Sequence, residues 1–113
     1  MHEVGITQSI VEIAERSARD QGAERVLSVT VEIGALSGVL ADAVEFCFEA
    51  CTGGTFLEGA ALLVHRIPGK GKCGDCGAEM ELDPYTFACA TCGAFALEVL
   101  QGNELRVTEM EVD

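Results

Sequence analysis

The residues CGDC (73–76) and CATC (89–92) organise this chain of 113 residues, and twelve residues separate the two motifs. Each Cys-x-x-Cys motif is typical of a tight turn, here called a knuckle, whose two sulfurs point at one metal ion. Gly77 and Gly93 directly follow the knuckles, where the backbone often needs a positive φ. We therefore expect a short hairpin, the ribbon (residues 69–100), that holds one structural Zn²⁺ through the thiolates of Cys73, Cys76, Cys89 and Cys92.

Two other interpretations of these cysteines exist. Iron of the rubredoxin kind uses the same four ligands and stays open at this point. Two disulfides, or four cysteines without a metal, would suit a secreted chain, but Met1-His2-Glu3 lacks the basic and then apolar layout of a signal peptide. No apolar run approaches the roughly 20 residues of a membrane span. We expect a cytoplasmic protein with no membrane contact.

The chain is strongly acidic, with a formal net charge of −12. Such a charge opposes binding to the phosphate backbone, so we expect no nucleic-acid partner despite the finger-like cysteines. An acidic surface instead suits a protein that handles cations or meets basic partners.

Two segments, residues 4–21 and 40–52, have the apolar period of amphipathic helices. The predicted stripe of the first consists of Ile6, Ile10, Ile13 and Ser17. That of the second consists of Leu40, Val44, Cys47, Phe48 and Cys51. We interpret Cys47 and Cys51 as core residues and not as a second metal site, because buried free cysteine behaves as a small hydrophobe.

Three segments, residues 26–33, 60–67 and 104–112, have the character of strands. In the first, Leu27, Val29, Val31 and Ile33 are expected on one face. In the last, the alternation slips between Val107 and Met110, which indicates a bulge. His65 is isolated within the second strand and is not expected to be a ligand.

The ribbon joins two of these strands, so we infer that it is inserted into a larger domain. The prediction is an α+β fold, in which residues 1–68 plus 101–113 form a three-stranded mixed sheet with two helices on one face. The inserted four-cysteine zinc ribbon forms a second, smaller domain.

No catalytic constellation is present. Gly69-Lys70-Gly71-Lys72 lacks the spacing of a phosphate-binding loop. Neither of the two histidines lies in a nucleophile motif. We therefore expect that the protein is not an enzyme.

The first three residues form a different kind of candidate site. The Met1 amine, the His2 amide nitrogen and the His2 imidazole can close adjoining chelate rings on one metal. The Glu3 amide, the Glu3 carboxylate or a second imidazole would complete the set. Nitrogen donors in a plane suit Ni(II) or Cu(II), although a histidine at position 2 does not by itself establish a site.

Four pieces of the sequence, in order, resemble the HypA/HybF family of hydrogenase maturation factors, and the resemblance extends along the full chain. These pieces are Met1–Glu3, VEIGALSGV at 31–39, the two knuckles, and GNEL at 102–105. The family is known as nickel metallochaperones. The resemblance implies that this protein delivers Ni(II), together with a HypB-type GTPase, to the precursor of the [NiFe]-hydrogenase large subunit.

The resemblance also implies roles for particular residues. His2 would be the essential nickel ligand, supported by Met1 and Glu3, and the four knuckle cysteines would hold structural zinc. Some family members also serve urease, so the client stays open, as does the choice between a monomer and a homodimer. Family members often carry an acidic residue directly after the Ser-Gly-Val piece, where this chain has Leu40-Ala41. The competing class is a zinc-ribbon adaptor that assembles proteins without carrying nickel.

Overall fold

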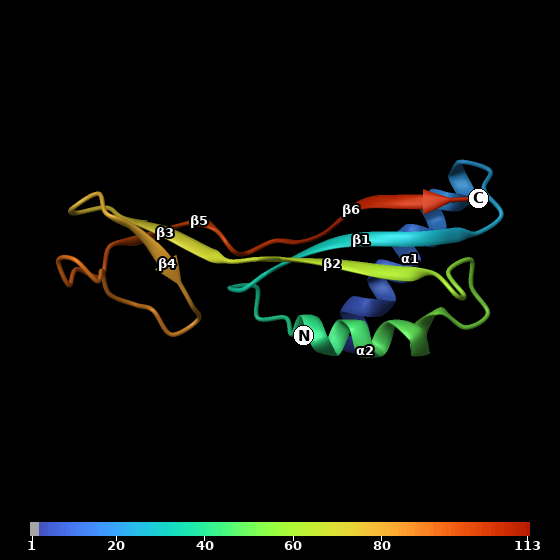
Figure 1. The fold of residues 1–113 in the computed structure, drawn as a ribbon, viewed down its shortest axis with the longest axis horizontal. Helices are drawn as coiled ribbons and strands as arrows, with labels where there is room; N and C mark the ends of the chain where they lie inside the picture. Colours follow the sequence, from blue (N-terminus) through green and yellow to red (C-terminus); the bar gives the residue numbers. More distant parts are fainter. Residues whose placement is uncertain (1–2) are drawn as a thin grey trace.

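Residues 3–113 are described in a computed structural model of the chain. Figure 1 shows two lobes along the long axis of the molecule, with the helices in one lobe only. The radius of gyration is 17.4 Å, whereas a compact domain of this length would have about 13 Å. In order, the elements are α1 (Glu3–Asp20), β1 (Val26–Gly34), α2 (Ala41–Thr52), β2 (Ala61–Ile67), β3 (Gly69–Cys73), β4 (Glu79–Leu82), β5 (Leu97–Gln101) and β6 (Leu105–Val112).

The helical lobe contains α1, α2 and a three-stranded sheet in the order β2-β1-β6. Strand β2 runs parallel to β1, from the pair Ser28 and Ala61 to the pair Gly34 and Ile67. The parallel pairing follows from the connection, because α2 carries the chain from β1 back to the start of β2. Strand β6 pairs with β1 in the antiparallel direction. The predicted mixed sheet is therefore confirmed.

One hydrophobic core joins the sheet to both helices. Val29, Val31 and Ile33 of β1 are buried at alternating positions, as a half-buried strand requires. They belong to one cluster with residues of α1 and α2, which is completed by Ile6, Ile10, Val11, Ala14, Ala18, Val26, Val44, Phe48 and Leu57. Since both helices contribute to one cluster with β1, they cover the same face, and the predicted α+β class is confirmed.

The buried side of α1 differs from the predicted stripe. Ile13 is 53% exposed, while Ala14 and Ala18 are buried in its place. Short alanine side chains let the helix approach the sheet closely, and this turns Ile13 towards solvent. The prediction of Ile13 as a core residue is wrong.

Two leucines predicted on buried faces are also exposed. Leu27 lies on the exposed side of β1, because the register against β6 shifts between Val26 and Ser28 and places Val26 in the core. Leu40 is 68% exposed. It occupies the N-cap of α2 in an extended conformation, and therefore precedes the part of the helix that packs.

The bulge predicted in the last strand is confirmed. The register of β1 against β6 shifts between the pairs Thr30–Glu109 and Val31–Val107, which leaves Thr108 without a partner in the ladder. The extra residue brings Val107 and Met110 to the same side, where both pack against the core.

The second lobe is the ribbon sheet, made of β4, β3 and β5 in that order and entirely antiparallel. The predicted hairpin corresponds to β3 and β4, and β5 is an additional strand that ends one residue beyond the predicted boundary. Besides Cys73 at the end of β3, Leu82 is buried in this sheet. It covers Gly71, where an added Cβ would lie 2.4 Å from its Cδ1.

Within residues 3–113, no helix combines the length and the apolar character that crossing a membrane requires.

Leu57 offers a test of the helical lobe. It is 0% exposed and lies in the core cluster. We expect Leu57→Ala to lower the free energy of unfolding by about 2–5 kcal/mol, because the substitution removes buried methyl groups and leaves a cavity. Urea unfolding measures this change. Leu63→Ala, which truncates an exposed leucine of β2, is the matched control and should change stability by no more than about 0.5 kcal/mol; equal losses in both variants would contradict the assigned core.

Candidate metal centre

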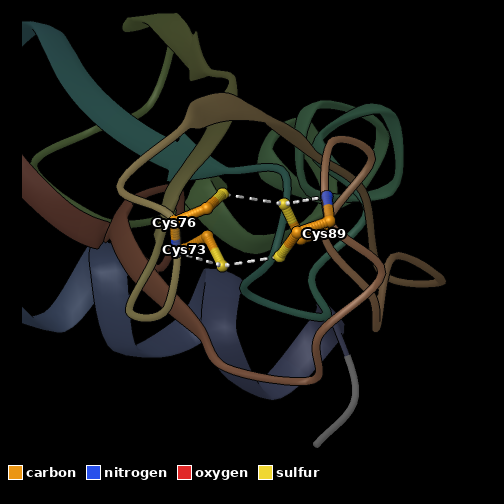
Figure 2. Close-up of side chains that lie close together, drawn as sticks. Cys73, Cys76 and Cys89 are labelled. Carbon is orange, nitrogen blue, oxygen red and sulfur yellow. Dashed lines mark hydrogen bonds between the residues drawn. The ribbon is translucent and has the colours of Figure 1, made fainter.

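The four knuckle cysteines come together at the outer end of the ribbon. Cys73 ends β3, and the other three lie in the loops that follow β3 and β4. The Sγ atoms of Cys73 and Cys92 are 3.6 Å apart, as are those of Cys76 and Cys89, and all four lie within 4.8 Å of one another. Figure 2 shows the sulfurs of Cys73 and Cys76 facing Cys89. The predicted ligand residues are therefore neighbours in space.

Each knuckle is a turn that directs backbone N–H groups at its first sulfur. The Cys76 amide lies 3.5 Å from the Cys73 sulfur, and the Cys92 amide lies 3.4 Å from the Cys89 sulfur. The turn then closes through Gly77 and Gly93, which have φ values of 77° each, as their positions in the sequence predict. Their N–H groups donate to the carbonyls of Cys73 and Cys89 at 2.9 Å in both cases.

Hydrogen bonds and neighbouring sulfurs shift the pKa values of Cys89 and Cys92 in opposite directions. The backbone N–H of Cys92 is the main reason that the pKa of Cys89 falls to about 6. The Ala94 N–H alone would lower the pKa of Cys92, but the neighbouring sulfurs, that of Cys73 first, together with burial raise it to about 12. Four thiols this close cannot all ionise alone, and a divalent cation among them would stabilise the thiolate form.

The donor set fits a tetrahedral divalent metal. Four sulfurs placed about 2.3 Å from a central Zn²⁺ would be about 3.8 Å apart, close to the spacing of these sulfurs. The same spacing is too long for disulfides, whose sulfurs are about 2.05 Å apart. All six cysteines of the chain are free thiols. Four thiolates complete the tetrahedron, so such a site leaves no position for a catalytic water. Zinc and iron both bind four thiolates in this tetrahedral arrangement.

Residues 1–112 match the family described as "Hydrogenase/urease nickel incorporation, metallochaperone, hypA". The chain belongs to the HypA family. A HypA-family protein has a role in nickel incorporation for hydrogenase maturation, and this agrees with the resemblance noted from the sequence.

Curated relatives give the same result over the full length. The chain is 57% identical over 113 residues to the hydrogenase maturation factor HypA of Geobacter metallireducens, and 52% identical to that of Geobacter sulfurreducens, with all of each chain covered. Among solved structures, the Ni metallochaperone HypA from Helicobacter pylori matches with a TM-score of 0.68 at 24% identity, covering 99% of this chain and 97% of that chain. A second solution structure, of a HypA protein, matches with a TM-score of 0.69 at 23% identity, covering 99% and 96%. Both structures support the fold.

The structure describes only one of the three residues of the predicted nickel site at the N-terminus. Met1 and His2 lie outside the described residues. Glu3 begins α1, and its Oε2 is 3.5 Å from the backbone nitrogen of Leu40. The resemblance to the family had drawn attention to Leu40, which stands where family members often have an acidic residue. The sequence alone does not show that Leu40 lies beside Glu3. The two positions meet because both helices begin at the same end of the lobe, as Figure 1 shows.

A cavity of about 670 Å³ opens beside Leu40, and the sequence analysis did not anticipate it. Its walls are mostly apolar and come from the ends of β1 and β2 and the start of α2. Arg66 lies at its edge and donates to Asp42 at 2.6 Å and to Glu45 at 2.9 Å. The hydrogen bond with Asp42 is the main reason that the pKa of Arg66 is raised. This ion pair ties β2 to the first turn of α2.

The remaining candidates lie apart from the cysteine cluster. His65 is exposed on β2, and Cys47 and Cys51 are half-buried on α2, with Cys51 packed against the core. Within the described part of the chain, one group of three or more His, Cys, Asp or Glu side chains is arranged to hold an ion. It consists of Cys73, Cys76, Cys89 and Cys92.

Proposed function

We propose that this protein binds Ni(II) at its N-terminus and delivers it, with a HypB-type GTPase, to the precursor of the [NiFe]-hydrogenase large subunit. The observation that carries the proposal is the match of residues 1–112 to a nickel-incorporation family. Urease stays a possible client, because the description of the family names both enzymes.

The two lobes divide the metals between them. Residues 1–68 and 101–113 form the nickel domain, in which His2 is the main ligand and Met1 and Glu3 assist. Residues 69–100 form the zinc domain, in which the four clustered thiolates hold a structural Zn²⁺. A closed tetrahedron of thiolates suits a permanent ion, whereas a terminus with few side-chain ligands suits an ion that is passed on.

The geometry around Glu3 supports this use of the terminus. Its carboxylate lies next to the start of α2, where the positive end of the helix favours an anionic group. The apolar cavity that Leu40 lines is therefore close to Glu3. A GTPase that docks against this cavity would reach the nickel directly, and GTP hydrolysis would be the partner's task. This protein itself is not an enzyme in this account.

One observation favours the second candidate, an adaptor without nickel transfer. The ribbon carries three largely exposed aromatic side chains, which are Tyr85, Phe87 and Phe95. Exposed aromatic groups are common at protein interfaces. An adaptor would use the ribbon in the same way whether or not the N-terminus binds metal.

Nickel titration of the protein with its native terminus, beside a version with extra residues ahead of Met1, separates the two candidates. A chaperone that uses the Met1 amine should lose affinity when this amine becomes an amide, because one chelate ring is removed while the His2 imidazole remains. Calorimetry measures the change. Equal nickel affinity for the two proteins, or no nickel binding at all, would overturn the proposed site. Zinc content measured alongside should be the same in both proteins.

A further inference from the structure

The two lobes meet at a junction in which three glycine backbones touch. Gly34 ends β1, Gly69 begins β3, and Gly102 directly follows β5. A Cβ added to Gly34 would lie 1.9 Å from the carbonyl oxygen of Gly102, and one added to Gly102 would lie 2.8 Å from the Cα of Gly69. No side chain fits at these positions, so the chain enters and leaves the ribbon in direct contact with the end of the central strand.

Leu36 covers this contact. It is half-buried and belongs to the loop between β1 and α2. Its Cγ and Cδ1 atoms would lie 3.0 and 3.1 Å from a Cβ on Gly69, and both would lie 3.0 Å from a Cβ on Gly102. The side chain of Leu36 therefore occupies the space above both glycines, at the entrance and the exit of the ribbon.

Backbone hydrogen bonds hold the loop in place. The amide of Gly34 donates to Glu104 at 2.7 Å, that of Ala35 to Ile67 at 2.9 Å, and that of Leu36 to Gly102 at 2.8 Å. Three successive residues thus bind both segments that connect the lobes, one before β3 and one after β5. The Ser37 hydroxyl fixes the loop further, because it donates to the Gly34 carbonyl at 2.7 Å and accepts the Val39 amide at 3.2 Å.

The two connections are also tied to each other. The Gln101 side-chain amide donates to the Pro68 carbonyl at 2.8 Å. Within the connection from β5 to β6, the Glu104 carboxylate accepts the Gly102 amide at 2.8 Å and stiffens this segment. Two glycine-containing connections would otherwise let the ribbon swing, since glycine restricts the backbone least and small interfaces between domains permit motion.

We propose that Leu36 is a positioning residue that locks the ribbon in one orientation relative to the sheet of the helical lobe. The same loop ends at Leu40, whose amide lies beside Glu3. The loop therefore connects the junction to the metal-binding terminus, and Leu36 sets where the ribbon stands relative to the nickel. This last step rests on the proposed function, whereas the fixed orientation does not.

Residual dipolar couplings of zinc-loaded, nickel-free protein test the fixed orientation. In the unsubstituted protein, amides of both lobes should fit a single alignment tensor. In Leu36→Ala, each lobe should fit well alone, but one tensor should no longer describe both. Leu100→Ala, the same truncation at a 53% exposed leucine of β5, should keep a single tensor, and so should Leu36→Met, which restores the volume. Zinc should stay at one ion per chain in every variant.

Either of two results would overturn the fixed orientation, namely two tensors in the unsubstituted protein or one tensor in zinc-loaded Leu36→Ala. Two tensors in the unsubstituted protein would overturn the fixed orientation without any variant, and therefore even if Leu36→Ala fails to fold. Neither measurement involves nickel, so failure here is separate from failure of the nickel titration. For the step towards delivery, Leu36→Ala should keep its nickel affinity and mature less hydrogenase. Normal maturation with two tensors would contradict that step.

Discussion

Replacing Cys73 with serine is expected to release the metal from the ribbon and to unfold it, while the helical lobe stays folded. A serine hydroxyl does not replace a thiolate as a zinc ligand, so the tetrahedron loses one of its four sulfurs. Binding of structural zinc supplies roughly 10–16 kcal/mol in small zinc domains. The ribbon offers little to compensate for that loss, since its buried side chains are Leu82, Cys73 and Cys89.

Elemental analysis and two-dimensional NMR measure the two parts of this prediction. Zinc should fall from one ion per chain to well below one, and amides of β3, β4 and β5 should lose their dispersion. Amides of β1, β2 and β6 should keep theirs, because their core cluster contains no ribbon residue. Cys47→Ser, a matched change at a half-buried cysteine of α2, should retain the zinc. A Cys73→Ser protein with one zinc per chain and an intact ribbon would contradict the assigned ligands. Iron in place of zinc in the unsubstituted protein would change the identity of the metal and leave the ligands as assigned.

Local patterns in the sequence predicted the parts of the structure that depend on short-range geometry. A knuckle is a turn of a few residues, so its spacing and its glycine specify it almost completely, and the cysteine cluster was predictable. The bulge in β6 was predictable for a similar reason. Because one face of β6 must stay buried, its apolar residues should alternate. The slip in this alternation between Val107 and Met110 is visible in the sequence.

The sequence did not predict features that depend on contacts between distant segments. Strand β5 was missed because its register against β3 shifts between Lys70 and Gly71, which breaks the alternation of its apolar residues. Ile13 was wrongly placed in the core, since helical period alone does not say which side of a wide stripe faces the sheet. The junction was invisible as well, because Gly34, Gly69 and Gly102 are far apart in the chain and each looks like an ordinary turn residue. The nickel ligands were proposed from the donor atoms of the first three residues and from the resemblance to the family, and they remain a prediction.

Replacing His2 with alanine is expected to cause the largest loss of nickel binding. The substitution removes a strong nitrogen donor and one of the chelate rings that the terminus can form. Removing a residue that only hydrogen-bonds to a metal ligand can lower metal affinity by roughly 100-fold. Removing the ligand His2 itself should lower nickel affinity by more than that. In a strain that depends on this protein, hydrogenase maturation should fail unless the medium contains excess nickel. Binding to the unsubstituted terminus should also weaken as pH falls, because its ligands must lose protons.

Calorimetric nickel titration of untagged protein measures this effect, and two controls separate it from a general defect. His2→Ala should keep one zinc per chain and a normal unfolding curve, since the substituted residue precedes α1 and the four cysteines lie in the other lobe. His65→Ala removes the other histidine of the chain, which is exposed on β2, and should leave nickel affinity unchanged. If His2→Ala instead bound nickel as tightly as the unsubstituted protein, the ion would have to be held elsewhere, and Cys47 and Cys51 would be the next pair to replace.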